Sequence, residues 1–120
     1  MKKKIVIVED EFIIAEDLKL TVKSFGYDVM KVLGSPQEVY DFLREKTPDL
    51  ILLDIKLAGK PSGIEVARYV DRLYKIPIVF CSAFHDKVTL DSIKDLHIKM
   101  VKKPFLDFVL KDAIDSTINK

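Results

Sequence analysis

The sequence predicts an α/β fold in which a doubly wound parallel sheet carries helices on both faces. Five short apolar runs, rich in β-branched residues, recur along the chain at 5–8, 29–33, 50–53, 76–80 and 98–101. Runs that are apolar at consecutive positions are typical of strands covered on both faces. The intervals between the runs are long enough for a crossover helix each. We therefore expect five βα units in one parallel sheet.

An apolar stripe and a capping box predict the first two helices. After the first run, apolar residues at helical spacing form one stripe, and Gly26 follows it as a C-cap. The stripe consists of Ile14, Ala15, Leu18, Val22 and Phe25. After the second run, Ser35 is a typical N-cap, with Pro36 at the first helical position and Glu38 at the third. Pro48 marks the end of this helical segment.

The later helices have weaker boundaries. Ser62 and Glu65 repeat the serine-to-glutamate spacing ahead of an apolar stripe, which predicts a third helix. A fourth helix is expected between the runs at 76–80 and 98–101. The last helix is expected to start near Phe105 and to bury some of Phe108, Val109, Ile114 and Thr117.

Length and composition indicate one folded domain. The chain has 120 residues, of which 48% are hydrophobic and 32% are charged. This balance differs from that of disordered, collagenous or disulfide-rich chains. Because single domains usually have roughly 100–200 residues, we expect residues 1–120 to form one domain. The sequence leaves open whether the native gene product continues into an output domain.

Charge and cysteine content exclude several classes of protein. The net charge of +1 argues against a dedicated nucleic-acid-binding protein. Cys81 is the single cysteine, so no intramolecular disulfide forms and a reducing compartment is favoured. The apolar run at 5–8 is too short for a signal peptide or a membrane span. We therefore expect a cytoplasmic protein with no direct contact to nucleic acid or membrane.

Polar and charged residues stand at the ends of four predicted strands. Glu9 and Asp10 follow the first run, Asp54 the third, Ser82 the fourth and Lys103 the fifth. Parallel strands bring these residues to one edge of the sheet, where ligands of doubly wound folds bind. A nucleotide site there would need a phosphate-binding loop after the first strand. The acidic loop of this chain would instead repel a phosphate unless a cation intervened.

The expected acidic cluster favours a divalent metal and a phosphoryl group. Three neighbouring carboxylates, from Glu9, Asp10 and Asp54, repel one another unless a cation balances them. Mg²⁺ prefers such oxygen ligands and often bridges to phosphate, with Mn²⁺ as an alternative ion. Together Mg²⁺ and Lys103 neutralise three carboxylates and can hold a phosphoryl group added to one of them. The Ser82 hydroxyl can donate a hydrogen bond to such a group.

These motifs, in this order and at these spacings, resemble the receiver domain of two-component response regulators over essentially the whole chain. The resemblance rests on four segments: Glu9-Asp10, the strand at 50–54, the step at 81–83, and Lys103-Pro104-Phe105. It implies a flavodoxin-like strand order of 2-1-3-4-5, as in chemotaxis regulators. It also implies a cis bond before Pro104.

The resemblance further implies how the metal is held. Asp10 would ligate Mg²⁺ directly, and Glu9 would act mostly through a metal-bound water. Asp54 would supply a carboxylate oxygen. The backbone carbonyl of Lys56, two residues later, would complete the protein ligands.

The resemblance assigns the phosphoryl chemistry to three residues. Asp54 would accept a phosphoryl group from the phosphohistidine of a sensor histidine kinase or a phosphotransfer protein. Ser82 would be the switch hydroxyl and Lys103 would pair with the phosphoryl group. The face formed by the fourth helix, fifth strand and fifth helix would then control an output protein or output domain, with phosphorylation-dependent dimerisation as one outcome. Met100 occupies the position where the family usually has an aromatic switch residue.

Two other functions remain open. A Mg²⁺-dependent enzyme with an aspartyl-phosphate intermediate would need a second acid two residues after the nucleophile, where this chain has Lys56. A receiver-shaped interaction module that is never phosphorylated usually lacks part of the acidic, aspartate and lysine set, all of which is present here. We therefore expect a signalling phosphoacceptor domain rather than a dedicated enzyme.

Overall fold

The computed structural model describes residues 2–54, 63–82, 91, 94–96 and 98–119. Five parallel strands form one sheet in the order β2-β1-β3-β4-β5. The strands are β1 (Lys4–Glu9), β2 (Asp28–Leu33), β3 (Leu50–Asp54), β4 (Ile78–Ser82) and β5 (Ile98–Lys102). The helices are α1 (Phe12–Ser24), α2 (Pro36–Leu43), α3 (Gly63–Tyr74) and α5 (Asp107–Ile118). The α/β class and the strand order predicted from the sequence are thus confirmed.

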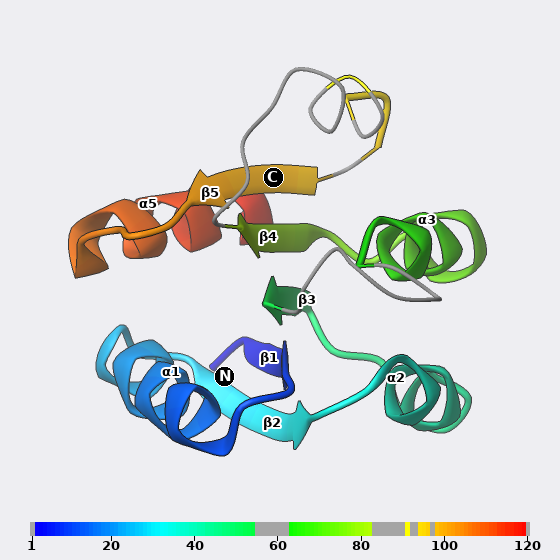
Figure 1. The fold of residues 1–120 in the computed structure, drawn as a ribbon, viewed down its shortest axis with the longest axis horizontal. Coiled ribbons are helices and arrows are strands. Elements are labelled where there is room, and N and C mark those ends of the chain that lie inside the picture. Colours follow the sequence, from blue (N-terminus) through cyan, green and yellow to red (C-terminus); the bar gives the residue numbers. More distant parts are fainter. Residues whose placement is uncertain (1, 55–62, 83–90, 92–93, 97, 120) are drawn as a thin grey trace.

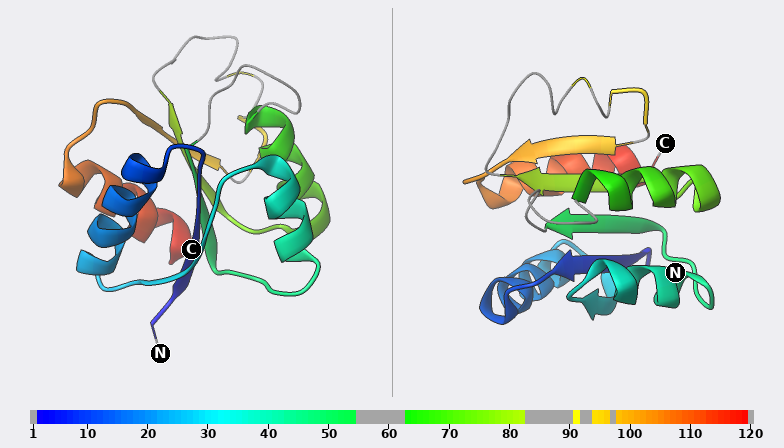
Figure 2. Two further views of the ribbon diagram at one scale, coloured as in Figure 1. Left: turned by 60° about the horizontal axis from the view of Figure 1, so that its bottom comes forward. Right: turned by 45° about the vertical axis from the view of Figure 1, so that its right-hand side comes forward.

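Helices cover both faces of the sheet. Figures 1 and 2 show α1 and α5 on one face and α2 and α3 on the other. The helix expected between β4 and β5 lies largely outside the described residues. None of the described helices is long and apolar enough to cross a membrane.

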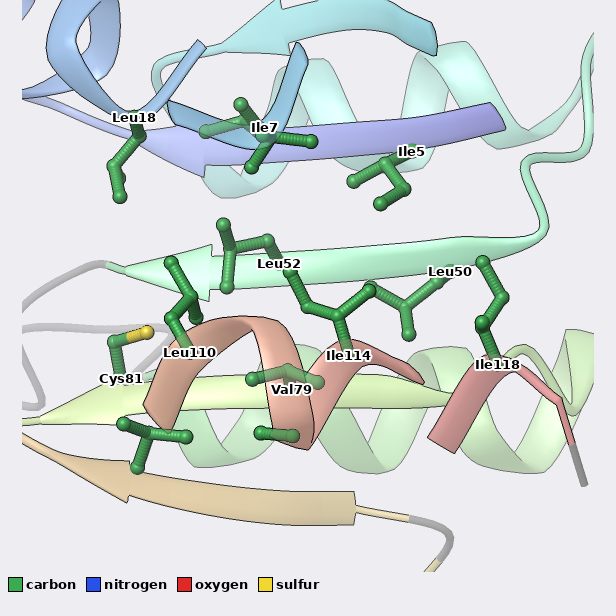
Figure 3. Packing of buried hydrophobic residues seen from close by; sticks show 13 residues of the cluster. Ile5, Ile7, Leu18, Leu50, Leu52, Val79, Cys81, Leu110, Ile114 and Ile118 are labelled. Atoms are coloured by element: carbon green, nitrogen blue, oxygen red, sulfur yellow. The ribbon is translucent and has the colours of Figure 1, made fainter. Parts of the chain in front are cut away.

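Each face of the sheet has its own hydrophobic core. Alternate side chains of β1, Ile5 and Ile7, pack with α1 and α5, and Figure 3 shows this cluster. The side chains between them, Val6 and Val8, pack with α2 and α3. This alternation explains why the central strands are apolar at consecutive positions before their last residues, because a strand covered on both faces has no solvent side.

Local capping follows the predicted pattern. The Glu38 backbone N–H donates to Ser35 Oγ (3.3 Å) at the start of α2, and the Glu38 carboxylate accepts from the Gly34 N–H (2.9 Å). At the end of α1, Gly26 has a φ of 98°, a left-handed conformation that favours glycine. Ser62, the N-cap expected for α3, lies outside the described residues.

Three boundaries differ from the sequence prediction. The helical segment that starts after Ser35 is predicted to end at Pro48, but α2 ends at Leu43. The fourth strand was expected at 76–80, but β4 is Ile78–Ser82. Pro77 has no N–H to donate to a strand ladder, so the regular strand starts after it although Ile76 is buried. The last helix starts at Asp107 rather than near Phe105, and it buries Ile114 while Phe108 is 68% exposed.

Candidate functional site

The candidate site is built on the last residues of the two central strands. Glu9 ends β1 and Asp54 ends β3, and the two residues are partners in the parallel register. They are 5% and 4% exposed, and they are the buried charged residues in the described part of the chain. Each follows four buried apolar residues, so the strands themselves carry these carboxylates into a position shielded from water.

Lys103 brings a positive charge to Asp54. Its ammonium group forms an ion pair with Asp54 Oδ1. Burial lowers the pKa of Lys103, but the hydrogen bond and charge of Asp54, with the charge of Glu9, outweigh it and raise the pKa. The Lys103–Pro104 peptide bond is cis, as the family resemblance implies.

The second carboxylate oxygen of Asp54, unlike the first, lacks a partner among the described residues. Asp54 Oδ2 is buried and has no hydrogen-bond partner among the described groups. A buried carboxylate oxygen without a partner costs free energy, so native proteins usually provide a donor, water or an ion. This atom is therefore a natural ligand position for a cation.

The surroundings of Glu9 disfavour its charged form. Burial raises its pKa to about 8, and the hydrogen bond with Asp10 and the charge of Asp54 add to the rise. The Glu11 backbone N–H donates to Glu9 Oε2 (2.8 Å) and partly offsets this effect. The sequence could not reveal this contact, because any residue except proline supplies such an N–H.

Of the other residues predicted for the site, Asp10, Ser82 and Met100 lie in the described part of the chain. Asp10 is exposed at the end of β1, next to Glu9. Ser82 is the last residue of β4 and pairs in register with Lys102, while Lys56 lies outside the described residues. Met100 is partly buried against the core shared with α2 and α3.

The donor set suits a hard cation. In the described part of the chain, no three His, Cys, Asp or Glu side chains already form a grouped metal site. The unpartnered oxygen of Asp54 and the raised pKa of Glu9 nevertheless mark a buried place where a cation in addition to Lys103 would be favourable. Carboxylate oxygens are the ligands that Mg²⁺ prefers. The residues present therefore fit a magnesium ion.

Cys81 does not take part in this chemistry. The residue is buried in β4, and burial raises the pKa of its thiol, with the charge of Asp54 contributing. A buried thiol of this kind behaves as a small hydrophobic group and not as a nucleophile.

Comparisons with known proteins agree with the fold of the chain. The family model of the response regulator receiver domain matches residues 5–115. The signal receiver domain of a modulated diguanylate cyclase from Desulfovibrio desulfuricans G20 has a TM-score of 0.86 and 28% identity, over 99% of this chain and 95% of that chain. The N-terminal domain of a response regulator/sensory box/GGDEF 3-domain protein from Carboxydothermus hydrogenoformans has a TM-score of 0.83 and 26% identity, over 98% and 94% of the two chains.

A third similar structure is longer than this chain. The anti-anti-sigma factor PhyR from Bartonella quintana has a TM-score of 0.80 and 31% identity over 99% of this chain. The match covers 48% of PhyR, so this chain spans about half the length of that protein. Because the family model covers nearly the whole chain, the protein belongs to the response regulator receiver domain family.

Proposed function

We propose that this receiver domain accepts a phosphoryl group on Asp54 from the phosphohistidine of a histidine kinase or phosphotransfer protein. The observation that carries the proposal is the pairing of a buried Asp54 with Lys103 on one side and Glu9 on the other. A buried carboxylate held between a cation and a second acid, at the carboxyl edge of a parallel sheet, suits an acyl phosphate better than a structural role.

Three residues have roles in the proposed transfer. A carboxylate oxygen of Asp54 forms a bond to phosphorus while the bond from phosphorus to the histidine nitrogen breaks, and the nitrogen keeps the electron pair. Lys103 already contacts this carboxylate and is placed to balance the negative charge that arrives. The Ser82 hydroxyl is proposed to donate to the transferred group.

The same residues would hold a magnesium ion. The proposed ligands are Asp10, Asp54 and the Lys56 backbone carbonyl, with Glu9 acting through a water. When bound, the ion would neutralise the carboxylates and the phosphoryl oxygens as they come together.

The proposed response involves β5 and α5. Lys103 directly follows β5, and the exposed apolar side chains of Leu106 and Phe108 come next along the chain. A movement of Lys103 on phosphorylation would therefore change the position of the start of α5. We propose that this surface, with the expected fourth helix, controls an output protein, an output domain or a dimer contact. The role is signalling, and the domain would assist only its own phosphorylation and dephosphorylation.

Phosphorylation can be tested with acetyl phosphate and Mg²⁺, read by intact mass. We expect one phosphoryl adduct on the wild-type chain and on Asp17→Asn, which changes an exposed acid of α1. Asp54→Asn should show no adduct, and removal of the metal with EDTA should slow wild-type labelling. An equal adduct on Asp54→Asn, or none on the wild type, would contradict the proposal.

A further inference from the structure

A cavity of about 630 Å³ lies at the amino ends of β4 and β5, whereas Asp54 lies at the carboxyl end of β3. Its lining comes from the segment between α3 and β4, the start of β5 and the last turn of α5. Figure 3 shows Ile118, one of the lining residues, toward the same end of the sheet as Leu50, the first residue of β3. Cavities of roughly 300–1,000 Å³ are typical of binding sites for small molecules. The cavity is therefore large enough for a small organic ligand and separate from the candidate site.

The lining of the cavity combines apolar surface with positive charge. Four lining residues are apolar: Pro77, Leu96, Ile98 and Ile118. Lys75 and Lys99 are the charged residues among the described residues of the lining, and both are exposed. Neither lysine forms an ion pair within the described part of the chain. Both positive charges are therefore available to a ligand.

Acidic groups near the cavity do not balance these two charges. No acid is among the described residues that line it. Asp115 of α5 is bound to Tyr27 and Lys111, Asp71 of α3 also has an interaction partner, and Asp95 is exposed to water. The negative ends of the α3 and α5 dipoles point to this region, but each amounts to only about half a charge. The cavity therefore has an excess of positive charge.

Lys75 occupies a backbone position that favours glycine. Its N–H ends α3 by donating to the carbonyl oxygens of Val70 (3.1 Å) and Asp71 (3.2 Å). Its φ of 53° lies in the left-handed region, which is unfavourable for a residue with a Cβ atom, and after α1 the chain uses Gly26 in this conformation. Arg72 already supplies a positive charge to the last turn of α3. Capping and the helix dipole therefore do not explain the lysine, whereas a role of its side chain in the cavity does.

Lys99 and Thr117 complete the polar part of the lining. Lys99 lies on β5, an edge strand, where a lysine alone would also serve to discourage pairing with other strands. Two lysines in one cavity are what indicates an anion site. The Thr117 hydroxyl forms no hydrogen bond within the described part of the chain, so it can donate to a ligand. Ser116 Oγ already donates to the Ala113 carbonyl oxygen (3.2 Å).

We propose that this cavity binds a small organic anion with an apolar body. The carboxylate or phosphate group of the ligand binds Lys75 and Lys99 and accepts from Thr117, and its apolar body packs against Leu96 and Ile98. Lysine is a compact point charge that suits both anionic groups. The cavity and Asp54 lie at opposite ends of the sheet, so the inference does not depend on the proposed phosphorylation.

The proposal can be tested by NMR titration of the unphosphorylated full chain with 2-naphthoate and, separately, with 2-naphthyl phosphate. Neutral 2-naphthamide, which has the same ring system, is the control ligand. We expect saturable amide shift changes with the anions, concentrated near Lys75, at the start of β5 and at the end of α5. The amide should bind at least about fivefold more weakly, because it lacks the charge that the lysines bind. The tighter of the two anions identifies the anionic group.

Lys75→Gly separates a binding role from a structural one. It removes the charge and the unfavourable backbone conformation together, so it should weaken anion binding by about fivefold while the protein stays at least as stable in urea denaturation. Lys99→Gln should weaken binding by a similar factor. Lys23→Gln, which removes an exposed charge of α1 outside the cavity, should change the affinity less than about twofold.

Several outcomes would overturn the inference. The absence of saturable shift changes with both anions, or equal binding of 2-naphthamide, would show that the cavity does not select an anion. Shift changes that concentrate elsewhere would place the anion site outside the cavity. Equal weakening by Lys75→Gly and Lys23→Gln would mean that general charge attraction causes binding. A Lys75→Gly variant that is less stable than the wild type would show that the lysine has a structural role.

Discussion

The central strands β1 and β3 each contain two different environments. The inner residues of each strand, such as Ile7 and Leu52, are apolar and completely shielded from water. The last residues, Glu9 and Asp54, are almost equally shielded but carry carboxylates. Within one strand of five or six residues, burial therefore lowers the free energy of the fold at the apolar positions and raises it at the carboxylate. Apolar burial stabilises the fold, whereas burial of a carboxylate costs free energy unless partners compensate.

This contrast separates stability from function along the strand. Burial of the apolar interior of the sheet offsets the cost of the carboxylates at its edge. Proteins commonly retain destabilising groups at functional sites for this reason.

The largest effect is expected in the strand interior. Leu52→Ala removes buried apolar atoms from the core between the sheet, α1 and α5, and leaves a cavity. It should lower the free energy of unfolding by about 2–5 kcal/mol, measured by urea denaturation. Leu20→Ala, at a side chain that is 69% exposed on α1, should change it by less than about 0.5 kcal/mol. Similar losses in both variants would mean that burial does not set stability here.

At the strand end, removing a charge should have the opposite sign. Without metal, Asp54→Asn removes one of two adjacent buried carboxylates, and the ammonium of Lys103, whose side chain is 31% exposed, can still reach water, so the free energy of unfolding should rise by about 1 kcal/mol. Urea denaturation in EDTA measures this change.

Lys103→Met gives the matched comparison at the same site. It leaves the buried carboxylates without their cation and should lower the free energy of unfolding by about 1–3 kcal/mol. The loss should be smaller than for a fully buried pair, because the Lys103 side chain is 31% exposed. If Asp54→Asn also destabilises the protein, the strand-end carboxylate does not cost stability.

The strand interior and the candidate site were the parts most accessible to sequence reasoning. Consecutive apolar residues predict buried strands, and parallel strands necessarily bring residues such as Glu9 and Asp54 to one edge. No side-chain geometry was needed for that step. The ion pair between Lys103 and Asp54 follows the same rule, because β5 ends at this edge too.

Contacts that depend on side-chain reach could not be predicted. The Glu11 N–H that holds Glu9 has no sequence signal, since nearly every residue has this donor. The row of tyrosines across α2 and α3 requires the exact separation of two helices. Tyr27 and Asp115 are 88 positions apart in the sequence, and neither belongs to a recognisable motif.

Tyr27 and Asp115 form a polar contact in which the carboxylate has partners on both oxygens. The Tyr27 hydroxyl donates to Asp115 Oδ1, and Lys111 Nζ donates to Asp115 Oδ2 at 2.7 Å. The pair connects the start of β2 to α5. Unlike Asp54, this carboxylate should stabilise the fold. Tyr27→Phe should lower the free energy of unfolding at pH 7 by about 1 kcal/mol.

The stabilisation by Tyr27 and Asp115 depends on pH. The hydrogen bonds from Lys111 and Tyr27 lower the pKa of Asp115 below 3.8, so their stabilisation is present above that pH and is lost as the pH falls through the folded value. Burial and Asp115 raise the pKa of Tyr27 from 10.0 to about 12, so stability is also lost as the pH rises through that range. The difference between wild type and Tyr27→Phe, measured by urea denaturation across pH, should therefore be largest between these limits. A difference that stays constant down to pH values below 3.8 would show that the hydroxyl does not depend on an ionised Asp115.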